Sequence, residues 1–132
     1  DVINHNLETV IRLQRAVRPS AGYGRSLALL ARAKAEGLTT KSGLITGLGE
    51  SDKELLTALA DLAAVGVDIV TIGQYLRPST SHLPVQRWVT PQTFEMLADC
   101  GRELGIRHVE AGPLTRSSYN AFDSIQSLSP TP

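Results

Sequence analysis

One stretch decides the fold of this chain: Lys41-Ser42-Gly43-Leu44-Ile45-Thr46-Gly47-Leu48-Gly49-Glu50-Ser51. It begins with residues that suit a buried strand, turns through three glycines within seven positions, and ends where an amphipathic helix begins. Because glycine lacks a Cβ and tolerates positive φ, the backbone of such a turn can approach a ligand closely. The stretch therefore predicts a strand, a ligand-holding turn and a helix in an α/β protein.

On both sides of this stretch, strand-like and helix-like segments alternate. We expect strands at 2–6, 39–45, 67–75 and 108–111, and helices at 7–17, 25–36, 51–66 and 90–104. In the first helix, Asn6 is a candidate N-cap and Glu8 lies in the first turn, and in the third, Ser51 and Glu54 form a capping box. This alternation predicts a parallel sheet with helical crossovers, either half of a (β/α) barrel or one side of a doubly wound sheet.

The composition is that of a soluble globular domain. The 132 residues are 42% hydrophobic and 20% charged, and 13 basic residues balance 13 acidic ones. We therefore expect neither a nucleic-acid nor a membrane partner. The single cysteine, Cys100, excludes an internal disulfide and a multi-cysteine metal site made by this chain alone, and its helical pattern favours a small buried apolar residue.

The two ends of the chain carry separate expectations. The chain starts at Asp1 without an initiator methionine, as if in the middle of a strand, and we expect it to be a piece of a longer protein. Residues 1–121 are expected to form one domain. Residues 122–132 are rich in Ser and Pro and are expected to form a disordered tail.

Polar residues follow each predicted strand, and the carboxyl ends of parallel strands share one rim. They are Asn4, Asn6 and Glu8; the Gly47–Glu50 turn; Gln74, Tyr75 and Arg77; and the Arg116–Tyr119 segment. Side-chain amides beside a carboxylate suit a ligand with sugar hydroxyls, but helix capping explains Asn6 and Glu8 equally well. A strand end with Arg116, two hydroxyls and a phenol is typical of an anion site or the edge of a metal cluster, or of an ordinary polar strand exit.

Other site types are disfavoured. The glycine turn is neither a Gly-x-Gly-x-x-Gly fingerprint nor a P-loop, and by itself it is weak support for a ligand. No two histidines have metal-ligand spacing, and we interpret His5 and His108 as structural and His82 as a loop residue.

Five segments in order and register resemble the lipoyl synthase family over residues 1 to about 121. They are Asn4-His5-Asn6-Leu7-Glu8-Thr9, the stretch 41–50, Gly73-Gln74-Tyr75-Leu76-Arg77-Pro78, His82-Leu83-Pro84-Val85, and Gly112-Pro113-Leu114-Thr115-Arg116-Ser117-Ser118-Tyr119. The resemblance implies the C-terminal half of a partial, TIM-like radical S-adenosylmethionine (SAM) barrel. It also implies an enzyme that inserts sulfur at C6 and C8 of an octanoyl chain on a lysine of a carrier protein.

The family implies roles for individual residues. Gly43, Ile45, Gly47 and Glu50 match the radical SAM Gly-x-Ile-x-Gly-x-x-Glu motif that supports SAM, Asn6 and Glu8 match the ribose-contacting pair, and Tyr75 matches the strand end near the adenine. Asn4 would face the substrate. Ser118, or alternatively Ser117, would bind the auxiliary 4Fe–4S cluster that supplies sulfur, with Arg116 as support.

Two three-cysteine motifs of the family have no counterpart in this chain. Because clusters of this type need thiolate ligands, we expect the chain by itself to be inactive. Implied partners are SAM, two 4Fe–4S clusters, an electron donor and octanoylated carriers, namely the glycine cleavage H protein and E2 subunits of 2-oxoacid dehydrogenases. The expected location is the bacterial cytoplasm, with mitochondria and plastids left open. Alternatives are a biotin synthase-like sulfurtransferase or a non-catalytic half-barrel.

Overall fold

The computed structural model describes residues 1–18 and 22–115, and its core is a four-stranded parallel sheet. The strands are adjacent in chain order: β1 (Val2–Asn4), β2 (Thr39–Thr46), β3 (Ile69–Gln74) and β4 (His108–Gly112). Each neighbouring pair is parallel. The predicted α/β class, with parallel strands and helical crossovers, is confirmed.

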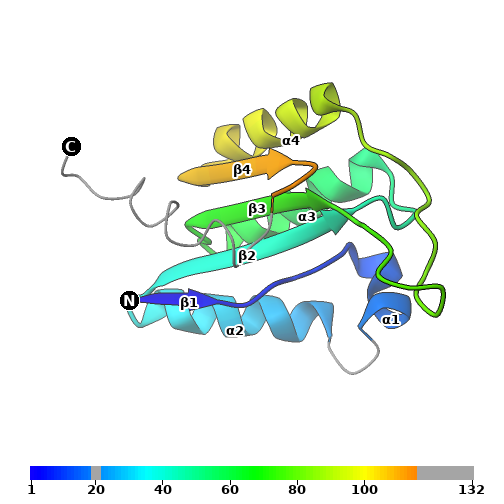
Figure 1. Ribbon diagram of the computed structural model, residues 1–132. Coiled ribbons are helices and arrows are strands. Elements are labelled where there is room, and N and C mark those ends of the chain that lie inside the picture. Colours follow the sequence, from blue (N-terminus) through cyan, green and yellow to red (C-terminus); the bar gives the residue numbers. More distant parts are fainter. Residues whose placement is uncertain (19–21, 116–132) are drawn as a thin grey trace.

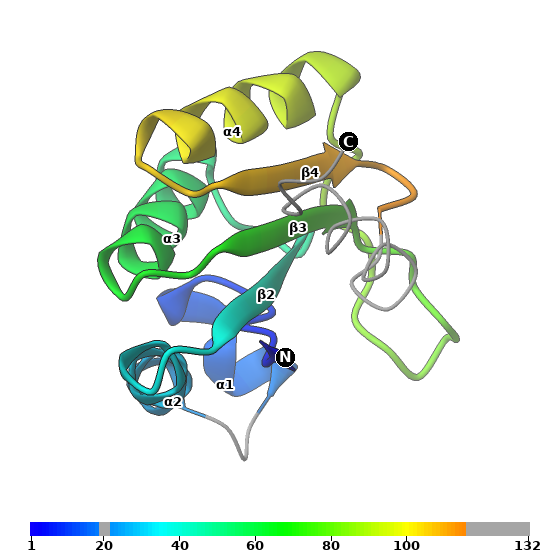
Figure 2. The ribbon, with the colours of Figure 1, turned by 90° about the vertical axis from the view of Figure 1, so that its left-hand side faces the viewer.

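Three long helices cover one face of the sheet, and no described helix covers the other (Figures 1 and 2). They are α2 (Tyr23–Ala35), α3 (Asp52–Ala64) and α4 (Pro91–Glu103). The hydrophobic core lies between these helices and the sheet, and it includes Leu30, Leu59, Val70 and Leu97. This one-sided arrangement is that of half a (β/α) barrel, in which the bare face points toward the interior.

Local signals set the limits of these helices as predicted. The Ser51 side chain accepts a hydrogen bond from the Glu54 amide, and the Glu54 carboxylate accepts one from the Ser51 amide, so the capping box is formed. Thr90 caps α4 in the same way, with Pro91 as the first helical residue. Observed and predicted limits of β2, α2, α3, α4 and β4 differ by at most two residues.

The helix predicted at 7–17 is wrong for residues 7–10, and residues 11–17 form two short helices instead of one. The chain stays extended after β1, and it becomes helical only at the short helices η1 (Ile11–Leu13) and α1 (Gln14–Val17). The Glu8 amide donates to the Gly43 carbonyl, and the Glu8 carbonyl accepts from the Ile45 amide at 2.7 Å, so residues around Glu8 continue alongside β2. Asn6 is therefore no N-cap, because pairing with β2 replaces the helical hydrogen bonds.

The bare face of the sheet is markedly polar. Leu44 packs into the core, so Lys41, Gly43 and Ile45 point to the opposite face by alternation, and Asn4 lies opposite Lys41 in the register. His5 faces the helices, where its ring contacts the Ser26 hydroxyl at 3.0 Å. Asn4 and Asn6 therefore lie on the bare face, and His5 lies on the face that the helices cover.

Candidate functional site

A cavity of about 490 Å³ lies at the carboxyl ends of the strands, where the long loop after β3 and helix α1 meet (Figure 1). Its walls come from residues of three regions that are distant in sequence, 8–17, 45–48 and 75–84. They are Glu8, Ala16, Val17, Ile45, Leu48, Tyr75, Ser81, His82, Leu83 and Pro84. Three of the predicted site residues, Glu8, Ile45 and Tyr75, thus line one cavity, in mixed polar and apolar surroundings.

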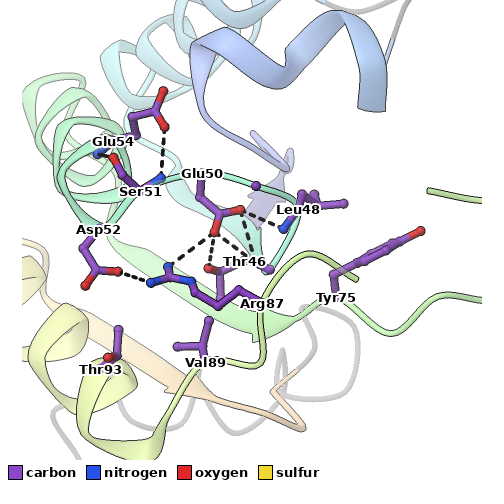
Figure 3. A network of polar contacts seen from close by, with 12 residues as sticks. Thr46, Leu48, Glu50, Ser51, Asp52, Glu54, Tyr75, Arg87, Val89 and Thr93 are labelled. Atoms are coloured by element: carbon purple, nitrogen blue, oxygen red, sulfur yellow. Dashed lines mark hydrogen bonds and ion pairs between the residues drawn. The ribbon is translucent and has the colours of Figure 1, made fainter. Parts of the chain in front are cut away.

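The glycine turn beside this cavity is held by the carboxylate of Glu50 (Figure 3). This side chain is fully buried, and it accepts hydrogen bonds from the Gly47 amide at 3.0 Å, the Leu48 amide at 3.0 Å and the Thr46 hydroxyl at 2.8 Å. Hydrogen bonds to a carboxylate are among the stronger ones in proteins. Glu50 therefore shapes the turn from within.

Residues 83–89, which we call the strap, lie directly against this turn. The Gln86 amide donates to the Gly47 carbonyl at 2.8 Å, and the Gln74 side chain bonds both the Arg87 carbonyl and the Val89 amide. Gly47 has a φ of +105°, and a Cβ there would lie 2.4 Å from Gln74 Nε2 and 2.7 Å from the Arg87 carbonyl oxygen. Only glycine permits this approach of turn and strap.

Two arginines stabilise the turn, one from the strap and one from η1. Arg87 of the strap contacts Asp52 at 2.8 Å and Glu50 at 3.5 Å. Arg12 of η1 makes a bidentate contact with Glu54 and also donates to the Gly49 carbonyl at 2.9 Å. The hydrogen bond from Arg12 lowers the pKa of Glu54 to about 2.

Glu8 has the only positive φ, 73°, found on a non-glycine residue among the described positions. Left-handed backbone disfavours residues with a Cβ by roughly 1–2 kcal/mol, so the surrounding structure must enforce it. The Gln14 side chain donates to the carbonyls of Leu7 and Thr9, and Arg18 donates to those of Asn6 and Leu7. These bonds hold Glu8 at the cavity.

A second polar cluster lies on the bare face of the sheet. A Cβ on Gly43 would come within 3.0 Å of both Asn6 Oδ1 and Thr71 Oγ1. Asn6 Oδ1 is buried without a hydrogen-bond partner, which is costly unless a ligand or water supplies one. Lys41 is buried in the preceding row of side chains, where burial lowers its pKa and Glu110 counteracts the shift.

The residues present fit SAM. The unpartnered oxygen of Asn6 and the carboxylate of Glu8 suit ribose hydroxyls, Gly43 leaves room for Asn6 to lie close against the sheet, and Ile45 and Tyr75 provide walls for an adenine. Asn4 lies farther along the bare face, toward the amino ends of the strands. Arg116, Ser117, Ser118 and the tail at 122–132 lie outside the described residues.

The described residues do not fit an iron–sulfur cluster. Within residues 1–18 and 22–115, no group of three His, Cys, Asp or Glu side chains could hold a metal ion. Cys100 lies half-buried on α4, with its thiol 3.8 Å from the Met96 sulfur. In the same described part of the chain, none of the helices is long and apolar enough to cross a membrane.

Several residues that organise the site were missed in the sequence. No motif marks the side chains of Arg12, Gln14 and Arg18, and Thr46 is an unspecified position within the glycine stretch. The partners of these side chains lie up to 42 positions away in the sequence. Arg87 lies in the long loop after β3, and no sequence pattern singles it out. His82, taken as a loop residue without a role, lines the cavity and contacts the Ser79 hydroxyl at 2.8 Å.

Fold and site together define the chain as a parallel α/β protein of the half-barrel type, with a small-molecule cavity at the carboxyl ends of its strands. No protein-family model matches the chain. It is 53% identical over 128 residues to the lipoyl synthase of Rubrobacter xylanophilus, 54% over 127 residues to that of Nitratidesulfovibrio vulgaris, and 50% over 132 residues to that of Chlorobaculum parvum. Over nearly its whole length the chain is therefore homologous to lipoyl synthases.

These matches cover most of this chain but less than half of each relative. They span 96%, 96% and 98% of the chain, and 40%, 43% and 45% of the respective relatives. The family resemblance drawn from the sequence motifs is therefore confirmed, for a chain that spans under half the length of these relatives.

Proposed function

We propose that this chain forms the SAM-supporting wall of a lipoyl synthase, an enzyme that inserts sulfur at C6 and C8 of a protein-bound octanoyl-lysine. The single observation that carries the proposal is the meeting of Glu8, Ile45 and Tyr75 in one cavity beside the glycine turn. These residues are distant in sequence and belong to three of the motifs that resemble the family.

The geometry supports a different role for each of the site residues. Glu8 and Asn6 bind ribose hydroxyls, because a carboxylate accepts two protons and an amide both donates and accepts. Ile45 and Tyr75 flank the adenine. Gly43 acts indirectly by leaving room for Asn6 against the sheet, and Gly47 and Glu50 act indirectly by fixing the turn. Asn4, on the bare face, contacts the octanoyl substrate.

The remaining groups come from outside the described residues. When bound, SAM and its 4Fe–4S cluster supply the radical chemistry, and an auxiliary 4Fe–4S cluster supplies the sulfur. Ser118, or alternatively Ser117, is the proposed oxygen ligand of the auxiliary cluster, with Arg116 beside it. Since the chain lacks the cysteine motifs, we propose that it is inactive alone and acts in the cytoplasm as part of a complete enzyme, on an octanoylated H protein or E2 subunit.

A chimera tests the proposal. This chain would replace the matching segment of the Nitratidesulfovibrio vulgaris lipoyl synthase, to which it is 54% identical. After anaerobic reconstitution with iron and sulfide, the chimera is expected to convert an octanoylated H protein to the lipoylated form when given SAM and a reductant, as measured by mass spectrometry. The chain alone is expected to form no product.

The outcomes separate the parts of the proposal. A chimera that folds and binds both clusters, yet forms neither 5′-deoxyadenosine nor lipoyl product, contradicts the SAM-supporting role. Formation of 5′-deoxyadenosine without lipoyl product preserves that role and refutes the octanoyl substrate. Within the chimera, Ser118→Ala and Ser117→Ala test the cluster ligand, because only loss of the ligand should spare SAM cleavage and abolish product.

Substitution of Glu8 provides a sharper test, because Glu8→Gly is expected to increase stability while it weakens SAM binding. Glu8→Gly relieves the left-handed strain and is expected to raise the free energy of unfolding by about 0.5 kcal/mol. It also removes the carboxylate, so SAM affinity of the chimera should fall by about tenfold or more. Equilibrium dialysis and denaturant unfolding measure the two effects.

Glu8→Gln is the matched control, since it keeps the side-chain size and the backbone strain. It should weaken SAM binding without any gain in stability. Unchanged SAM affinity in both variants would refute the assignment of Glu8 to the ribose hydroxyls.

A further inference from the structure

The strap and the glycine turn form one unit across the carboxyl ends of β2 and β3. The Gln86 amide bonds the Gly47 carbonyl, and Gln74, the last residue of β3, bonds the backbone of Arg87 and Val89. Val89 is buried, whereas the neighbouring Trp88 is 67% exposed. The strap is therefore held through its backbone and through Val89 in the hydrophobic core, and one charged side chain also reaches inward from it.

That side chain is Arg87, which joins three elements (Figure 3). Its guanidinium lies 2.8 Å from Asp52, in the first turn of α3, and 3.5 Å from Glu50, inside the turn. The Asp52 side chain is 42% exposed, although its Oδ1 that contacts Arg87 is buried, whereas the Glu50 side chain is fully buried. A planar fork of donors can span two carboxylates in this way, whereas a lysine ammonium is a point charge.

The position of the strap determines one wall of the cavity. Leu83, at the start of the strap, lines the cavity together with Pro84, and the Tyr75 hydroxyl donates to the Leu83 carbonyl at 2.6 Å. Arg77 stiffens the preceding loop through the carbonyls of Thr80 and His82. Because these contacts are continuous with the strap, a shift of the strap would move the wall.

We propose that Arg87 is a positioning residue that fixes the strap against the glycine turn and thereby sets the shape of the ligand cavity. Arg87 is not among the residues that line the cavity, and it acts through Glu50, Asp52 and the backbone of the strap. The identity of the ligand as SAM rests on the proposed function, whereas the fastening of the strap does not.

Hydrogen exchange of individual amides tests the fastening in the 132-residue chain. In Arg87→Met, the Gln86 and Val89 amides are expected to exchange about tenfold faster than in the wild type, because neighbouring contacts in one network are coupled. Amides in the β3–β4 pairing should keep their rates. Arg87→Lys should restore part of the protection, since one ion pair can re-form.

Two further variants complete the comparison. Asp52→Asn removes one ion pair of Arg87 and leaves Glu50 untouched, so a smaller increase of about threefold is expected even if Arg87→Met fails to fold. Arg102→Met removes another arginine–aspartate pair, with Asp99 on α4, and should leave the Gln86 and Val89 rates unchanged. Unchanged Gln86 and Val89 rates in Asp52→Asn and in any folded Arg87 variant overturn the proposal.

SAM binding by the chimera provides the second readout. If Arg87 sets the cavity wall, Arg87→Met should weaken SAM binding by about tenfold, with a smaller loss in Arg87→Lys. A variant whose Gln86 and Val89 amides exchange faster but whose SAM affinity equals that of the wild type would overturn the proposal that Arg87 sets the shape of the cavity. A wild-type chimera that binds no SAM overturns the proposed function, while the exchange rates still decide whether Arg87 fastens the strap.

Discussion

Two buried acidic residues, Asp68 and Glu50, lie at opposite ends of the same sheet, and each is 4% exposed as a whole residue. Both accept hydrogen bonds from neighbouring groups, but they stabilise different parts of the fold. Asp68, ahead of β3, accepts from the Thr40 amide at 2.9 Å and from Lys34 Nζ at 2.8 Å. Its backbone also bonds Thr40 and His108, so it joins the starts of three strands. Asp68 thus fixes how β2, β3 and β4 align.

Glu50 contacts Thr46, Gly47, Leu48 and Arg87, and the first three of these lie within four residues of it. It fixes a single turn beside a cavity and is connected to the strap only through Arg87. The comparison teaches that a buried, hydrogen-bonded carboxylate is not by itself a sign of a site. Its position at the carboxyl ends of parallel strands is what gives Glu50 a place near a ligand.

The largest expected effect comes from the turn itself. Gly47→Ala combines positive-φ strain with a clash against Gln74 and the Arg87 carbonyl, and it should lower the free energy of unfolding by about 3 kcal/mol. Gly105→Ala is the matched control: φ is +103°, and no atom lies within 4 Å of the added Cβ. It should cost only about 1 kcal/mol. Equal losses in urea unfolding would refute the close approach of the strap.

The next effect compares the two carboxylates directly. Glu50→Gln and Asp68→Asn should each lower the free energy of unfolding by about 2 kcal/mol, because each leaves buried donors poorly paired. Only Glu50→Gln should also weaken SAM binding by the chimera, by about tenfold. A comparable loss of SAM affinity in Asp68→Asn would show that the two ends of the sheet are not functionally distinct.

The smallest effect concerns the exposed side of the turn. The pKa of Glu54 falls from 4.5 to about 2 through its bonds to Arg12 and Ser51. Its contribution to stability is therefore complete above pH 4.5, and it is lost as the pH falls from 4.5 through 2. The difference in unfolding free energy between the wild type and Glu54→Gln should shrink over this window. A difference that stays constant would contradict the ion pair with Arg12.

The sequence predictions agree with the structure where the interactions join residues that are close in sequence. The capping box of Ser51 and Glu54 acts over three residues, and the predicted start of α3 is correct. The start of the helix predicted at 7–17 failed because apolar side chains at this spacing can be buried by an extended chain as well as by a helix. Leu7 and Val10 are buried in the extended chain, whereas Ile11 is 67% exposed.

The site shows the same division. The motifs identified the carboxyl ends of the strands, and Glu8, Ile45 and Tyr75 do line one cavity. The left-handed backbone of Glu8 could not be predicted, because it depends on Gln14, Arg18 and the edge of β2. The pairing of Arg87 with Glu50 joins residues 37 positions apart, and no local pattern encodes it.

The sequence by itself determined the alternation of strands and helices, the helix caps, the glycine turn and the family. All of these depend on residues a few positions apart or on motifs preserved in order. Only the tertiary structure decided how residues 7–10 run, which carboxylate faces a cavity, and what the turn packs against. Those features depend on side chains that meet across the sheet, and their energies exist only once the strands have paired.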